Sequence, residues 1–100
     1  MNKCHFLGRA TSIHFWETDN CASVIEFSLE VEEFRKEKNG NKVRDLSCFN
    51  MEAWGSAAKA LHQYLEEGGL LAVESIARND GDADNTFFRI TSFKILPLEN

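Results

Sequence analysis

Hydrophobic and polar positions alternate along much of this chain, and a period of two residues is typical of a half-buried β-strand. The clearest alternation starts at Val24, after which every second residue is apolar: Ile25, Phe27, Leu29 and Val31. The positions between them are polar: Glu26, Ser28, Glu30 and Glu32. Residues 3–10 repeat the pattern less regularly, and Gly8 among them indicates a bulge or the close approach of another backbone.

Turn-forming residues separate these two strands from three others. Asn39-Gly40 predicts a two-residue hairpin turn, because both residues tolerate the positive φ angle that such a turn requires. A third strand then returns from about Val43 to Trp54. Two more strands are predicted on either side of an Asp- and Gly-rich turn: 70–78 and 86–96.

A short helix is predicted between the third and fourth strands. Ser56 is placed to cap its first amides, and Gly68 and Gly69 are placed to end it. An apolar stripe recurs at helical spacing: Ala57, Leu61, Tyr64 and Leu65. Three strands, a helix and two strands is the order of the five-stranded oligonucleotide-binding barrel, an all-β fold with one helix. An open α+β sheet with one covering helix is the alternative, and either would form a single domain over residues 1–100.

Composition narrows the class of protein. The chain has 100 residues, of which 43% are apolar, enough for one core. No apolar run approaches the roughly 20 residues of a membrane span, so we expect a soluble, cytoplasmic protein. Three cysteines without CxxC spacing fit reduced thiols. The three histidines fall on different predicted elements, and no phosphate-binding loop is present, so we expect no enzyme, metal or cofactor.

Several short motifs resemble the DNA-binding domain of bacterial single-stranded DNA-binding proteins over nearly the whole chain. They are Met1-Asn2-Lys3 with Leu7-Gly8-Arg9, Phe27-Ser28-Leu29, Trp54-Gly55 with Ala58, Tyr64-Leu65 with Gly68, and Val73-Glu74. The most specific stretch runs from Trp54 to Gly68. The resemblance implies a homotetramer or dimer that wraps single-stranded DNA without sequence preference in replication, recombination or repair, with replication or repair proteins as possible partners.

Aromatic residues are the candidates for stacking on bases, which any base sequence permits. The resemblance places Trp54 at a stacking position near the end of the third strand, although a core tryptophan is the alternative. Phe34 lies near a second such position. Phe88 and Phe87 are adjacent, so at most one faces the core, and Phe88 is the predicted contact. Trp16, expected in the loop after the first strand, is a candidate ligand contact or interface anchor.

Charge is distributed unevenly in this chain of net charge −5. The hairpin segment 35–44 carries one acid and five cations: Arg35, Lys36, Lys38, Lys42 and Arg44. In the resembled family this hairpin contacts DNA. Each phosphate contact there would add about −0.7 to the slope of log affinity against log salt concentration. The alternative is a solvated hairpin tip. Arg9 and Arg78 complete the predicted contacts, and Arg89 adds further positive charge.

Other positions depart from the family pattern and predict weaker binding. Asp80, Asp82 and Asp84 occupy a hairpin where the family has basic or aromatic residues, and Cys48 stands where it often has a stacking aromatic. The sequence stops at Asn100 without the acidic-tipped tail of common members, so either that tail is missing or this is a short form. Two other functions remain open: an accessory, protein-binding subunit of a primosome-like assembly with weak or no DNA binding, or single-stranded RNA binding.

Overall fold

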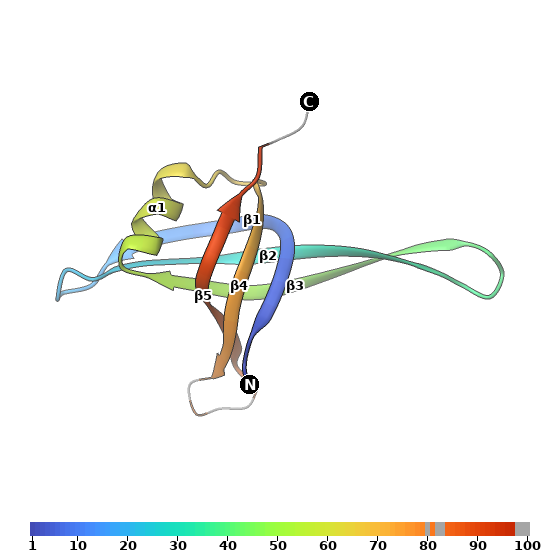
Figure 1. Cartoon of the computed structure of the whole chain (residues 1–100), viewed down its shortest axis with the longest axis horizontal. Coiled ribbons are helices and arrows are strands. Elements are labelled where there is room, and N and C mark those ends of the chain that lie inside the picture. Colours follow the sequence, from blue (N-terminus) through green and yellow to red (C-terminus); the bar gives the residue numbers. More distant parts are fainter. Residues whose placement is uncertain (80, 82–83, 98–100) are drawn as a thin grey trace.

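Five strands and one helix follow one another in the predicted order in the computed structural model, which describes residues 1–79, 81 and 84–97 (Figure 1). They are β1 (Cys4–Glu17), β2 (Ser23–Lys36), β3 (Lys42–Trp54), α1 (Ser56–Tyr64), β4 (Leu70–Asn79) and β5 (Thr86–Ile95). The strands close a barrel in the order β1-β2-β3-β5-β4, with α1 between β3 and β4 in sequence. The predicted oligonucleotide-binding barrel is thus confirmed. Within the described residues, no helix has the length and apolarity to cross a membrane.

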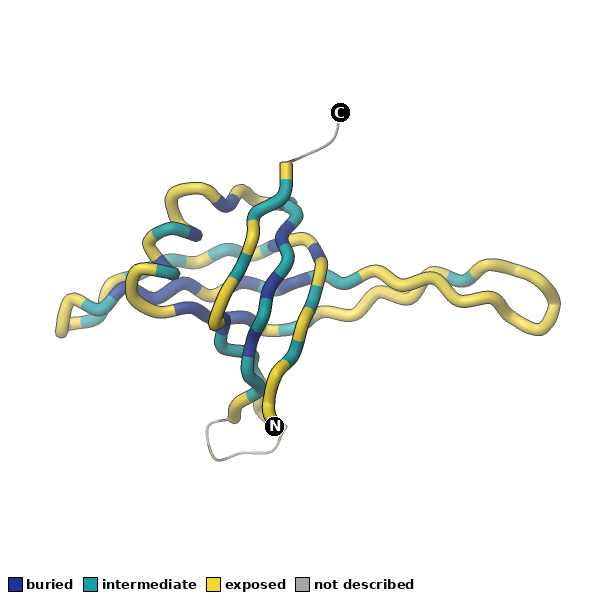
Figure 2. The backbone as a smooth tube through the Cα atoms, in the orientation of Figure 1, coloured by how far each residue is buried: buried dark blue, intermediate teal, exposed yellow. Residues whose placement is uncertain are grey.

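The barrel core is built from the alternation read in the sequence. Ile25, Phe27 and Leu29 of β2 are at most 4% exposed, and Leu71 of β4 is fully buried with them. Burial of each such side chain contributes about 1.5–3 kcal/mol to folding. Figure 2 shows buried backbone positions concentrated in the barrel and under the helix. The predicted parity of β2 is therefore confirmed.

The helix covers one end of this core with a narrower apolar stripe than predicted. Ala58 and Leu61 are fully buried, whereas Tyr64 is 64% exposed and points to solvent. The helix begins one residue earlier than expected: Gly55, and not Ser56, is the N-cap, and Ser56 is the first helical residue. No side chain caps this end, and the helix ends before the two glycines that follow it.

Gly8 marks a close approach of two backbones, as its place in the first strand predicted. A Cβ atom at this position would lie 2.4 Å from the carbonyl oxygen of Glu30 on β2. The strand bends here, since residues 4–9 pair with β4 and the strand pairs with β2 from Arg9 onward. A side chain at position 8 would therefore force two strands apart.

β1 is longer than predicted and includes Trp16, so the expected loop position of this residue is wrong. A bulge explains why the strand continues: between Thr11 and His14 one extra residue is accommodated, and Ser12 adopts a φ of +56°. The carboxylate of Glu67 accepts a hydrogen bond from the Ser12 amide at 2.5 Å. The bulge keeps His14 and Trp16 on the outward face of the strand.

The β2–β3 hairpin projects far from the barrel and gives the molecule its long dimension of 56 Å (Figures 1 and 2). Its strands remain paired to Lys36 and Lys42, and nearly all its side chains are exposed. The connection is five residues long, 37–41, and not the predicted two-residue turn. Only Gly40 has a positive φ, +84°, and its amide donates to the Glu37 carbonyl.

Candidate nucleic-acid interface

The outward faces of β1, β2 and β3 carry side chains in rows that cross the strands. Residues directly opposite each other on antiparallel neighbours point to the same side of a sheet. One row consists of Trp16, Val24 and Trp54, because Val24 pairs with Trp16 on one side and Trp54 on the other. Val24 is only 1% exposed, and its partners on the two neighbouring strands are the two tryptophans. Two predicted contacts distant in sequence thus belong to one apolar row.

The next row continues this surface with polar groups. His14, Glu26 and Glu52 lie opposite one another on β1, β2 and β3, and Arg89 extends the row across the parallel pairing of β3 with β5. The ring of His14 also contacts that of Trp16, with centroids 5.1 Å apart. A groove of about 500 Å³ follows this second row and reaches Trp54 of the first, and its lining includes His14, Glu26, Ser28, Asn50, Glu52, Trp54, Phe87 and Arg89. We call the outward faces of β1 to β3 with this groove the groove surface.

Trp54 lies at the surface of this groove, which excludes the alternative of a core tryptophan. It is 44% exposed, and its indole Nε1–H donates to Oε1 of Glu52 at 3.1 Å. The same oxygen accepts from Nε of Arg89 at 2.7 Å, and Nη2 of Arg89 lies 2.7 Å from it in an ion pair. The guanidinium carbon lies 5.7 Å from the centroid of the Trp54 ring. We call these three residues the Glu52 cluster.

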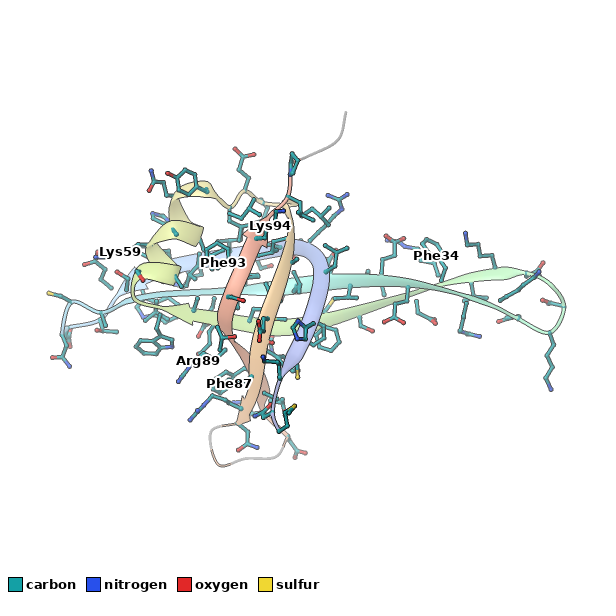
Figure 3. All side chains as sticks on the ribbon, in the orientation of Figure 1. Phe34, Lys59, Phe87, Arg89, Phe93 and Lys94 are labelled. Atoms are coloured by element: carbon teal, nitrogen blue, oxygen red, sulfur yellow. The ribbon has the colours of Figure 1, made fainter. Side chains whose placement is uncertain are left out.

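The two adjacent phenylalanines of β5 divide between core and groove, as alternation requires, but in the opposite sense to that predicted. Phe88 packs against Phe6 and Phe49, with ring centroids 5.2 and 5.5 Å away, and so contributes to the core. Phe87 instead lines the groove, and Figure 3 shows it close to Arg89. This placement corrects the sequence prediction, which took Phe88 for the contact residue.

Phe34 extends the groove surface along the projecting hairpin (Figure 3). It is 57% exposed, and its even position in β2 puts it on the same face as Glu26 in the groove. The ammonium of Lys42 lies 4.6 Å from the centroid of its ring. Leu46 is also exposed on this face, opposite Glu32 and two residue pairs nearer the barrel. Phe34 is therefore available to a ligand and is not a core residue.

The five hairpin cations differ in their freedom to meet a ligand. Arg35 pairs with Asp45 at 2.9 Å, and Arg44 pairs with Glu32 across the strands. Within the described residues, the three lysines form no ion pair: Lys36, Lys38 and Lys42. Two of them, Lys36 and Lys42, lie directly opposite each other at the end of the strand pairing, where like charges repel. A polyanion bound at the tip would relieve that repulsion.

The remaining predicted cations flank the groove surface. Arg9 is exposed opposite Glu30, and its Nη1 donates to the carbonyl oxygen of Gly68 at 3.1 Å. Arg78 is exposed opposite the groove residue Phe87. Cys48 is exposed on the outward face of β3, where an aromatic was expected from the family pattern. Of the acidic hairpin, Asp84 is exposed, and the other two predicted aspartates, Asp80 and Asp82, lie outside the described residues.

A second surface is formed by the outward faces of β4, β5 and the first half of β1. Lys3 pairs with Glu74 at 2.7 Å, and the hydrogen bond from Lys3 lowers the pKa of the Glu74 carboxyl below its usual value. Leu7 is 54% exposed on this side. Before Arg9, β1 pairs with β4 but not with β2, so one edge of the strand carries backbone groups that no neighbouring strand pairs.

A comparison with known protein families identifies the chain. The profile of the single-strand binding protein family matches residues 1–96. The chain belongs to this family. Its members are DNA-binding proteins and not enzymes. This agrees with the two predictions from the sequence, DNA binding and no enzymatic activity. The predicted resemblance is confirmed.

Solved structures share the fold of this family member at low sequence identity. The single-stranded DNA-binding protein of Plasmodium falciparum, in complex with single-stranded DNA, has a TM-score of 0.82 and 16% identity, covering 97% of this chain and 96% of that one. A deletion variant of the Thermus aquaticus protein has a TM-score of 0.81 and 16% identity over 97% of this chain. This chain spans about half, 51%, of that protein. The protein PriB of Ralstonia solanacearum has a TM-score of 0.74 and 11% identity, covering 96% and 99%. A comparison with curated proteins finds no match.

The groove of this family member contains residues that the sequence analysis did not select. Phe87 was discernible, because Phe88 and Ile90 share the inward parity and leave Phe87 and Arg89 facing outward. His14 was hidden by the bulge at Ser12, which shifts the alternation of β1. Nothing in the sequence indicates that Glu52 links Arg89 to Trp54, since that contact depends on how β3 and β5 meet.

Proposed function

We propose that this chain binds single-stranded DNA without sequence preference, as one domain over residues 1–100. The observation that carries the proposal is the row of Trp16, Val24 and Trp54 at the edge of an open groove in a member of the single-strand binding family. Each base has a π-face, so stacking on such rings contributes about 1–3 kcal/mol per base whatever the sequence. Phe87 and Phe34 supply further rings at the groove and on the hairpin.

Phosphates are proposed to bind along the hairpin and the flanks of the groove. Among the described residues, no carboxylate engages the three hairpin lysines, Arg9 or Arg78, whereas Arg35 and Arg44 contribute less because carboxylates already engage them. Glu26 and Glu30 lie on the same surface and oppose a polyanion. Affinity should therefore be lower than in a member with a wholly basic surface, and the protein would serve replication, recombination or repair in the cytoplasm.

The proposal includes assembly of several copies. The unpaired edge of β1 and the exposed Leu7 beside it favour association through this strand, either as a dimer or as a tetramer. We expect light scattering after gel filtration to give a mass of two or four times the 11.4 kDa of one chain. A mass of one chain at micromolar concentration would contradict the assembly without affecting the DNA-binding proposal.

Titration with oligo(dT) tests the main proposal. Trp16 and Trp54 lie on the groove surface, so a bound strand should quench tryptophan fluorescence in the micromolar range, and mixed-sequence DNA should do so with similar affinity. The same titration with oligo(U) compares RNA. Absence of quenching and of a mobility shift at low salt would reject nucleic-acid binding and favour the protein-binding accessory role.

The salt dependence of binding should depend on the hairpin lysines. Replacing Lys36 and Lys42 together by alanine should reduce the slope of log affinity against log salt by about 1.4, or about 0.7 for each lost phosphate contact. The slope is measured from fluorescence titrations at several salt concentrations.

A matched control changes the same net charge elsewhere. Lys59 on α1 and Lys94 on β5 are exposed and lie outside the groove lining (Figure 3). Their double replacement by alanine should leave the slope within about 0.3 of the wild-type value. Equal slopes for the two double variants would mean that the hairpin does not contact phosphates.

A further inference from the structure

Glu52 is an unusual residue for a surface that binds a polyanion. Its side chain is 12% exposed, and it lies between Glu26 on β2 and Arg89 on β5. A carboxylate buried to this extent requires a cation and hydrogen-bond donors to offset its desolvation. Arg89 and Trp54 supply them, because Nε of Arg89 and Nε1 of Trp54 both donate to Oε1 of Glu52, and Nη2 of Arg89 forms an ion pair with the same oxygen.

Oε1 of Glu52 orients two groups that can bind a nucleotide, the Trp54 ring and the Arg89 guanidinium. The bond from Nε1 holds the Trp54 indole in one orientation while 44% of the residue stays exposed. Arg89 has five N–H donors, of which the one on Nε donates to Glu52 Oε1, while Nη2 lies 2.7 Å from the same oxygen. Among the described residues the other donors make no hydrogen bond, and the side chain is 36% exposed. Arg89 can therefore hold Glu52 and a phosphate at the same time.

We propose that Glu52 is a positioning residue that sets the Trp54 ring and the Arg89 guanidinium side by side, so that they bind the base and the phosphate of one nucleotide. The distance of 5.7 Å between the guanidinium carbon and the ring centroid brings the two groups together at one end of the groove. This inference rests on the proposed function. It assigns a favourable role in DNA binding to a residue whose negative charge alone would oppose it.

Replacement of Glu52 separates positioning from charge. Glu52→Ala removes the acceptor and should weaken binding of oligo(dT) about tenfold, the effect of losing a hydrogen bond that involves a charged group. Glu52→Gln keeps an acceptor oxygen and should stay within about threefold of wild type. In a Trp54→Ala background, Glu52→Ala should cause less than half of its loss in the wild-type background, because the ring that it orients is gone.

Glu26→Ala is the matched control, since Glu26 lies directly opposite Glu52 on the same surface. Among the described residues it forms no ion pair, and its replacement removes the same charge without touching Trp54 or Arg89. We expect this variant to bind oligo(dT) more tightly than wild type, because a negative charge that opposes the polyanion is removed. If Glu52→Ala also binds as tightly as wild type or more so, the positioning role is overturned and only charge matters.

Glu52→Ala could lose affinity because it misfolds, and a thermal unfolding curve of the variant would reveal this. A measurement on the wild-type protein therefore tests the inference independently. The indole N–H of Trp54 is hydrogen-bonded, whereas that of Trp16 makes no hydrogen bond within the described residues. In nitrogen-15 NMR spectra the Trp54 indole proton should exchange with water at least about threefold more slowly than that of Trp16. Equal exchange rates would overturn the inference. Failure of wild-type protein to bind oligo(dT) would instead reject the proposed function, whatever the exchange rates.

Discussion

Trp54→Ala is expected to lower the affinity for oligo(dT) by about 5- to 150-fold, which corresponds to the 1–3 kcal/mol of one base stacked on an aromatic ring. The ring is 44% exposed at the edge of the groove, so its loss removes a ligand contact and little of the core. Thermal stability should change only slightly for the same reason. The affinity is measured by anisotropy of labelled oligo(dT), because the variant lacks one of the two tryptophans that would report binding.

Tyr64→Ala provides the control for this variant. Tyr64 is an aromatic residue with 64% exposure, but it lies on α1 and not in the groove lining. Its replacement should leave the affinity within about twofold of wild type, because no base stacks there. If both variants bind alike, Trp54 is not a stacking residue, and the ligand path must avoid the row that it forms with Val24 and Trp16.

Gly8→Ala is expected to have the largest effect on stability, lowering the free energy of unfolding by about 3 kcal/mol. The added Cβ would lie 2.4 Å from the carbonyl oxygen of Glu30. That oxygen belongs to a strand backbone and cannot rotate away, so β1 and β2 must separate where β1 passes from one neighbour to the other. Urea unfolding followed by circular dichroism measures the change.

Gly68→Ala separates this clash from backbone strain. Gly68 has a φ of +80°, and a Cβ there would meet nothing within 4 Å. Its replacement should cost about 1 kcal/mol, the penalty of the left-handed region for a residue with a side chain. Equal losses for the two variants would show that β1 yields at Gly8 and that the close approach does not constrain the barrel.

The fold was predictable because its determinants are local. The alternation of apolar and polar residues in β2 predicts which side chains enter the core. A glycine at position 8, within a strand, predicts the close approach of another backbone. The error in the helix cap has a local cause: position 55 is a glycine with a φ of +66°, so the chain turns into the helix without help from the Ser56 hydroxyl. Helix capping by backbone geometry leaves a weaker trace in the sequence than capping by a side chain.

The binding surface was only partly predictable, because it depends on how distant strands are aligned. Trp54 and Phe34 were identified from their places in the family pattern, and both are exposed as that role requires. Trp16 was assigned to a loop, since the extra residue at Ser12 interrupts the alternation and gives β1 the appearance of ending early. Glu52 and Arg89 meet only through the register of β3 with β5, which neither strand specifies alone.

The register of β3 with β5 also affects how the barrel moves. Only Met51 with Phe88 and Glu52 with Arg89 are in register there, whereas β1 and β4 are paired from residue 4 to residue 9. The short β3–β5 seam is thus the place where the barrel should open first in local fluctuations. A strand of DNA held by Trp54 on one side and Arg89 on the other would bridge the seam and close it. DNA binding would then stabilise the closed barrel. Without DNA, the protein would open transiently between β3 and β5, at its own binding site.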